Sequence, residues 1–123
     1  MSRGLGKIEQ AILEALEREA NDLSEEDREA GIERHIPLMN TRRLLEAIYG
    51  NIMEVAQSGK LMAKYNAITR ALRSLARKEL VVSFKHEGRT IWTDPQGASE
   101  LQELEKEAAR GLAHLKRRME LEG

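Results

Sequence analysis

Several residue types are absent or scarce in this chain of 123 residues, and each absence narrows the possibilities. It contains no cysteine, which excludes disulfides, thiolate chemistry and cysteine-based zinc sites. No run of 18 apolar residues occurs, and the start MSRGLGKIEQ lacks the apolar segment of a signal peptide. We therefore expect a soluble, cytoplasmic protein without a membrane partner, which would be nucleoid-associated in a bacterium or archaeon.

Aromatic residues are also few. The four are Tyr49, Tyr65, Phe84 and Trp92, so the predicted core consists mainly of aliphatic side chains. Proteins that bind single-stranded nucleic acid usually stack several bases on aromatic rings. The composition therefore weighs against such a platform, and duplex DNA is the favoured partner among nucleic acids.

The charges are unevenly distributed, although the net charge is only −1. Residues 1–39 hold five basic and ten acidic side chains, whereas residues 60–89 hold eight basic and two acidic ones. The local field decides whether phosphates are attracted, because charges are screened beyond about 10 Å. The segment 60–89 is therefore the candidate binding region.

Catalytic and metal-binding patterns are missing. His35, His86 and His114 are far apart in sequence, and Gly59-Lys60 lacks the upstream glycine of a phosphate-binding loop. The acidic run 25–33 is typical of a solvated face rather than of paired catalytic carboxylates. We expect no enzymatic activity, no cofactor and no metal.

The segment NAITRALRSLARKELVVSFKHEGRTIW, residues 66–92, is the most informative part of the chain. With about 100° per residue, Ile68, Ala71, Leu72 and Leu75 fall on one face of a helix. Asn66, Arg70, Arg73 and Arg77 gather on the opposite face within about 60°. Arginine and asparagine are residue types that read base edges in a major groove. The alternative is an ordinary solvated surface.

A hairpin is predicted directly after this helix. The stretch 80–85 is rich in β-branched residues, His86-Glu87-Gly88 is a plausible turn, and a second strand follows over 89–93. Lys85, His86 and Arg89 would lie at its tip, within reach of a phosphate backbone or minor groove. Trp92, in the second strand, is expected to be a core residue.

The stretches ITRALRSLARKELVV and FKHEGRTIW resemble the recognition helix and wing of winged helix-turn-helix domains. The resemblance covers about residues 7–92 and implies a mainly α (α+β) fold with a small hairpin wing. It implies a recognition helix over about 64–79, a wing over about 81–93, and sequence-specific binding of duplex DNA. Because no catalytic feature suggests a recombinase or nuclease, we expect a transcriptional regulator. By this resemblance the groove-facing residues are Lys64, Tyr65, Asn66, Thr69, Arg70 and Arg73.

Winged helices also serve as protein-interaction modules, and a replication, partition or nucleoid protein would share these features. Both remain alternative functions. Tyr65 lies beside the apolar face of its helix, so core packing is an equal alternative for it. In the family the turn before the recognition helix is short, whereas residues 50–63 form a longer span here, as a helix extension or a loop.

The sequence of the first half of the chain indicates two helices. Leu5, Ile8, Ile12 and Leu16 indicate a helix from Gly4 to about Ala20. A short helical turn after Ser24, or a loop, is expected next, and then an extended piece over residues 35–39. Asn40 is predicted to cap a second helix over residues 41–49, ending at Gly50. Arg42 and Arg43 in its first turn would contact the DNA backbone, or are simply solvated.

A last helix is expected from Ala98 to Glu120, after the turn-rich segment 94–97, with Ser99 and Gln102 as a capping box. We divide the chain into a winged-helix domain over 1–94 and this helix over 95–123. Its apolar residues form a narrow seam that needs a partner, either the first helix of the same chain or a second subunit. We favour a homodimer through Leu101, Leu104, Ala108, Leu112, Leu115 and Met119.

Overall fold

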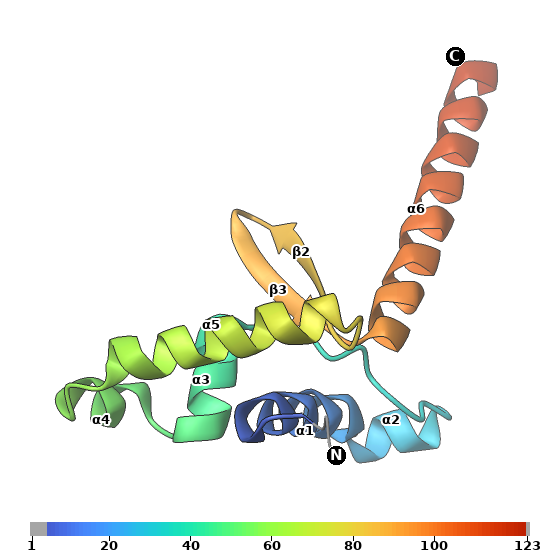
Figure 1. Ribbon diagram of the computed structural model, residues 1–123. Helices are drawn as coiled ribbons and strands as arrows, with labels where there is room; N and C mark the ends of the chain where they lie inside the picture. The colour runs from blue at the N-terminus through green and yellow to red at the C-terminus, as the bar shows by residue number, and fades with distance from the viewer. Residues whose placement is uncertain (1–4, 123) are drawn as a thin grey trace.

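The computed structural model describes residues 5–122, and the side chains of residues 5–121. The described chain is mainly helical with a small antiparallel sheet, as predicted at the level of fold class (Figure 1). The elements are, in order, α1 (Lys7–Asn21), α2 (Glu25–Glu29), β1 (Met39–Asn40), α3 (Thr41–Tyr49), α4 (Ile52–Gln57), α5 (Leu61–Arg77), β2 (Val82–His86), β3 (Arg89–Thr93) and α6 (Pro95–Glu122).

Helix α1 begins at Lys7, three residues after the predicted start, and Gly4 lies outside the described residues. Its first turn is held by the Glu9 carboxylate, which accepts a hydrogen bond from the Gly6 N–H at 3.3 Å. Ile12 and Leu16 are fully buried, as their helical spacing predicts. After α1, Ser24 and Asp27 cap each other's backbone N–H groups, so the short helix α2 is formed rather than a loop.

The predicted extended piece over residues 35–39 is only partly a strand. Pro37 is buried and has no N–H to donate, and strand pairing begins two residues later at Met39. Asn40 then caps α3 as predicted, with its side-chain oxygen 2.8 Å from the Arg43 N–H. Gly50, at φ 93°, ends α3.

The span 50–63, whose conformation the sequence left open, contains a separate short helix. Asn51 caps α4 by accepting from the Met53 N–H at 2.8 Å, and Gly59 at φ 77° turns the chain into α5. Helix α5 starts at Leu61 and ends at Arg77. The predicted helix, 64–79, therefore begins three residues and ends two residues too late. Glu79, at φ 61°, closes the helix together with a bond from the Leu80 N–H to the Leu75 carbonyl.

The sheet has the order β1-β3-β2, with both pairs antiparallel. Met39 lies opposite Trp92, and Ser83 lies opposite Trp92 on the other side. Pairing in β2 starts at Val82 rather than at Leu80. The sheet therefore joins the hairpin to the entrance of α3.

The core lies between α1, α3 and α5. Its fully buried large side chains include Ile12 and Leu16 from α1, Leu44 and Leu45 from α3, and Ile68, Leu72 and Leu75 from α5. Trp92 packs partly buried against this cluster, as expected, rather than projecting into solvent.

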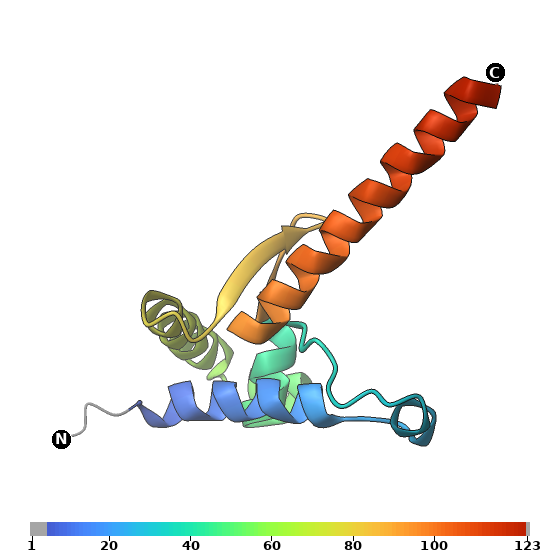
Figure 2. The ribbon, with the colours of Figure 1, turned by 90° about the vertical axis from the view of Figure 1, so that its right-hand side faces the viewer.

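Helix α6 leaves this body and projects into solvent in both views (Figures 1 and 2). It begins at Pro95, three residues before the predicted start, because Asp94 acts as its cap: the Asp94 carboxylate accepts from the Gly97 N–H at 2.7 Å. The predicted capping box at Ser99 is therefore wrong. Proline and glycine marked a turn in the sequence, but both fit the first turn of a helix.

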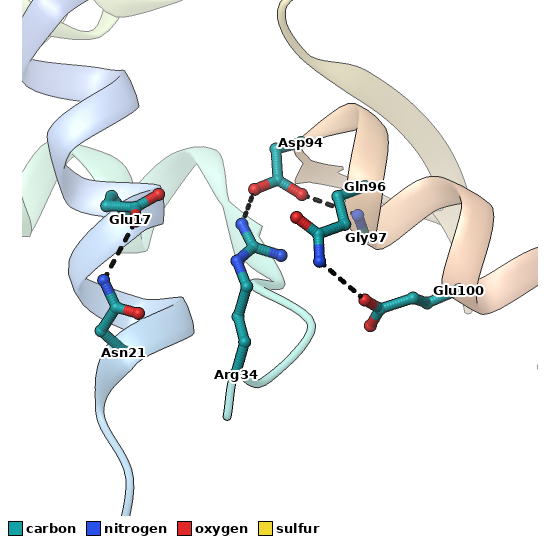
Figure 3. A network of polar contacts seen from close by, with 7 residues as sticks. All are labelled: Glu17, Asn21, Arg34, Asp94, Gln96, Gly97 and Glu100. Atoms are coloured by element: carbon teal, nitrogen blue, oxygen red, sulfur yellow. Dashed lines mark hydrogen bonds and ion pairs between the residues drawn. The ribbon is translucent and has the colours of Figure 1, made fainter. Parts of the chain in front are cut away.

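The base of α6 is fixed by contacts with the chain before β1. The Arg34 guanidinium donates to the Asp94 carboxylate, and Gln96 donates to Glu100 within the helix (Figure 3). Gly97 is buried so closely that a β-carbon there would lie 2.3 Å from Thr93 Oγ1 and 3.2 Å from Ile36. Glycine is thus required at this position to seat α6 on β3.

A polar clamp ties the start of α1 to the end of α5. Glu9 accepts from Lys78 Nζ at 2.9 Å and from Ser74 Oγ at 3.2 Å. The hydrogen bond from Lys78 lowers the pKa of Glu9 from its ordinary value of 4.5, and the bonds from Gly6 and Ser74 act in the same direction. The ionised carboxylate therefore stabilises the folded state.

Glu9→Gln is expected to lower the free energy of unfolding by about 1 to 2 kcal/mol at neutral pH, because a charged acceptor is replaced by a neutral one. A carboxylate with a lowered folded pKa stabilises above its unfolded pKa, and this contribution disappears as the pH falls through the folded pKa. The difference between the two proteins should thus be constant above about pH 5 and shrink below it. Urea unfolding from pH 3 to 7 measures this, with the exposed Glu14→Gln as control; an equal loss in both variants would contradict it.

Candidate nucleic-acid interface

Helix α5 has the two faces that its sequence predicts. Ile68, Leu72 and Leu75 are at most 1% exposed and pack into the core. Asn66, Arg70, Arg73 and Arg77 are all exposed on the other side. Of the predicted contact residues in α5, these four form a continuous solvent-facing surface, which we call the α5 polar face.

In the described part of the chain, no carboxylate oxygen lies within 4.0 Å of a nitrogen of the arginines of the α5 polar face. By contrast, Lys78 just after the end of α5 forms an ion pair with Glu9. Guanidinium groups without an internal carboxylate keep all their donors available for external acceptors. The face is thus positively charged and open.

Two other predicted contact residues are engaged within the protein. Thr69 is half-buried, and its hydroxyl donates to the Tyr65 carbonyl at 3.0 Å. Lys64 Nζ lies 4.2 Å from the centre of the Tyr49 ring, a cation-π contact with α3. Both side chains therefore have a partner within the protein in addition to any contact with a ligand.

Tyr65 is 43% exposed, so it does not pack in the core. It lines a groove together with Arg42 and with Arg89, where the start of α3, the first half of α5 and β3 meet. Asn40, Thr41 and Thr90 complete the groove. The sequence predicted three of these six residues as contacts. It missed the others because the pairing of Asn40 with Ile91 brings them there.

Arg42 and Arg43, predicted as a pair of backbone contacts, have different surroundings. Arg43 Nη2 lies 2.9 Å and 3.0 Å from the two Glu19 oxygens, and Nη1 donates to the Leu38 carbonyl at 3.2 Å. Among the described residues, the only ion pair of Arg42 is an exposed one with Glu46 within α3, at 3.2 Å. Exposed pairs contribute little by themselves, and both pairs are exposed. Arg42 is the more available of the two because Arg43 is also bonded to the Leu38 carbonyl.

The hairpin tip is a two-residue turn rather than the three-residue turn that we predicted. Glu87 and Gly88 both have positive φ, 51° and 78°, as in type I′ turns. His86 belongs to β2 and pairs with Arg89. Because side chains alternate along a strand, His86 and Arg89 share one face of the hairpin, and Lys85 lies on the other, where its Nζ donates to Thr90 Oγ1 at 2.7 Å.

The seam of α6 is largely exposed. Leu104, Leu112, Leu115 and Met119 are 53%, 66%, 54% and 72% exposed, Ala108 is exposed and Leu101 is half-buried. This excludes the first helix of the same chain as the partner of the seam within the described structure. Within residues 5–121 of a single chain, the seam therefore has no partner.

Residues 5–122 lack two further features, a metal-binding cluster and a membrane-spanning helix. No group of three or more potential metal-ligating side chains occurs there. None of the helices described is long and apolar enough to span a bilayer. No family model, curated protein or solved structure matches this chain.

Proposed function

We propose that this chain binds duplex DNA as a winged helix-turn-helix protein and regulates transcription, with α5 as the recognition helix and the β2-β3 hairpin as the wing. The observation that carries the proposal is the α5 polar face, which presents Asn66, Arg70, Arg73 and Arg77 to solvent without an acidic partner among the described residues. Such side chains pair with guanine, adenine and phosphate oxygens.

The surroundings of the α5 polar face support the same proposal. The groove of Arg42, Tyr65 and Arg89 lies at the amino-terminal half of α5, where a DNA backbone would run past a helix in the major groove. The element order α3, α5, β2, β3 is the one that the resemblance implies, and α4 stands where the family usually has a short turn. Arg43 is omitted from the proposed contacts because its guanidinium is bonded both to Glu19 and to the Leu38 carbonyl.

The partners in this proposal are duplex DNA and a second copy of the chain. A helix with an exposed apolar seam supports a homodimer, and two copies would present two recognition helices to a two-fold site. The contacts need no cofactor, and no catalytic step is part of the proposal.

Fluorescence anisotropy of a labelled duplex, titrated with protein at several salt concentrations, tests this function. Each neutralised phosphate contributes about −0.9 to the slope of log K against log salt. With about five phosphates contacted by each subunit, we expect a slope near −4.5 per subunit. Weak binding at all salt concentrations would overturn the proposal and favour a protein-interaction module instead.

A further inference from the structure

The exposed seam of α6 is almost symmetric about its own middle. Leu101 and Met119, Leu104 and Leu115, and Ala108 and Leu112 are pairs that all centre on residue 110 to within half a residue. If a second copy runs in the opposite direction, every seam residue therefore meets another seam residue. Ala108 then lies opposite Leu112, a small residue against a large one, whereas a parallel pair would place Ala108 against Ala108 and leave a gap.

The charges of α6 are segregated along its length. Residues 100–107 carry four glutamates and one lysine, and residues 110–118 carry three arginines, one lysine and no acidic residue. Two antiparallel copies would place the acidic half of each helix beside the basic half of the other. Two parallel copies would place like charges together along the whole contact.

The charges closest to the seam also favour an antiparallel pair over a parallel one. With about 100° per residue, Glu105 and Lys116 lie about 20 to 40° beyond one edge of the seam, and Glu100, Glu107 and Arg118 lie beyond the other edge. In an antiparallel pair each edge faces the same edge of its partner, so Glu105 meets Lys116 in the register centred on residue 110. In a parallel pair opposite edges meet, which brings Glu105 near Glu100 and Glu107, and Lys116 near Arg118.

The body of the protein continues the apolar surface at the base of α6. Ile36 and Leu104 line a groove there together with Glu100, and Ile32 and Leu38 beside it are 40% and 39% exposed. An antiparallel partner would carry its Leu115 and Met119 past this groove. The carboxyl-terminal end of the partner helix would thus pack against an apolar surface, and the Arg118 side chain of the partner helix would lie near Glu100.

We propose that α6 pairs with α6 of a second copy in antiparallel orientation, centred near residue 110, so that the two bodies lie at opposite ends of the helix pair. The proposal deepens the homodimer part of the proposed function. It gives the dimer a defined register, in which the starts of the two α6 helices are about 45 Å apart along the pair.

Single cysteines test the orientation, because the chain contains no cysteine of its own. The full-length variants Leu101→Cys and Met119→Cys would be oxidised separately and as an equimolar mixture, and read on a non-reducing gel with one variant carrying a size tag. We expect a cross-link only in the mixture. In the antiparallel register position 101 lies opposite position 119, whereas the two copies of position 101 are about 27 Å apart, beyond the reach of a disulfide.

A cross-link between two copies of the same variant, without a cross-link between the two different variants in the mixture, would show a parallel pair and overturn the proposal. A monomer mass for the unmodified chain in light scattering, or no cross-link in any sample, would also overturn it. The assay contains no DNA. A chain that forms the mixed cross-link but fails to bind duplex DNA would therefore refute the DNA-binding function alone, and the reverse result would refute the antiparallel dimer alone.

Discussion

Replacing Arg70 and Arg73 together by alanine is expected to weaken binding to duplex DNA by about 100-fold at 0.1 M salt. Both side chains are exposed on α5 without an acidic partner among the described residues, and each contact with a base edge or phosphate contributes about 1 to 3 kcal/mol. If both arginines contact phosphates, the salt slope should also become shallower by about 1.8. Anisotropy at several salt concentrations measures both quantities.

The matched control is Arg110→Ala/Arg117→Ala. These two arginines are exposed on α6 and lie on the side away from its seam. Their replacement removes the same charge as the replacement of Arg70 and Arg73. We expect their loss to change DNA affinity by less than about threefold, because they only contribute a screened, long-range field. Equal losses in the two double variants would mean that net charge, rather than the α5 polar face, controls binding.

Leu72→Ala is expected to lower the free energy of unfolding by about 3 kcal/mol, the largest stability change that we predict. Leu72 is 1% exposed in the cluster formed by α1, α3 and α5, so truncation leaves a cavity in the only large core described in residues 5–122. A domain of this size has about 5 to 15 kcal/mol in total, so the variant should unfold at a clearly lower urea concentration.

Met62→Ala serves as the control for this change. Met62 lies in the same helix but is 67% exposed, so its truncation should change stability by less than about 0.5 kcal/mol. Both substitutions introduce the best helix-forming residue, which separates packing from helix propensity. Similar urea midpoints for the two variants would show that the cluster around Leu72 does not hold the fold together.

The helices with strong local signals were predictable from sequence. The buried and exposed faces of α5 follow from its periodicity, and the cap of α3 follows from Asn40. Helix α4 has only six residues, too few for a periodic pattern, and the start of α6 was wrong because Asp94-Pro95 suits both a turn and a helix start. The residue types at positions 94 and 95 therefore cannot distinguish a turn from the start of a helix.

The parts of the candidate interface that depend on distant contacts were not predictable. Arg43 is held by Glu19, 24 residues away, and nothing in the sequence near either residue indicates the pair. The groove beside Tyr65 forms because β1 pairs with β3, which brings Arg42 near Arg89. The outward direction of α6 likewise follows from the tight packing around Gly97 rather than from the pattern of α6 itself.

The direct connection between β3 and α6 has a mechanical consequence. Only Asp94 separates the two elements, and it is fixed from one side by Arg34 and from the other by its cap on α6. We therefore expect a rotation of α6 to turn the hairpin with it. One residue inserted into α6 between its base and its middle would rotate the far half by about 100° and lengthen it by about 1.5 Å. If the chain binds DNA as an antiparallel dimer, the length of α6 in residues would therefore set the spacing and the rotational phase of the two half-sites.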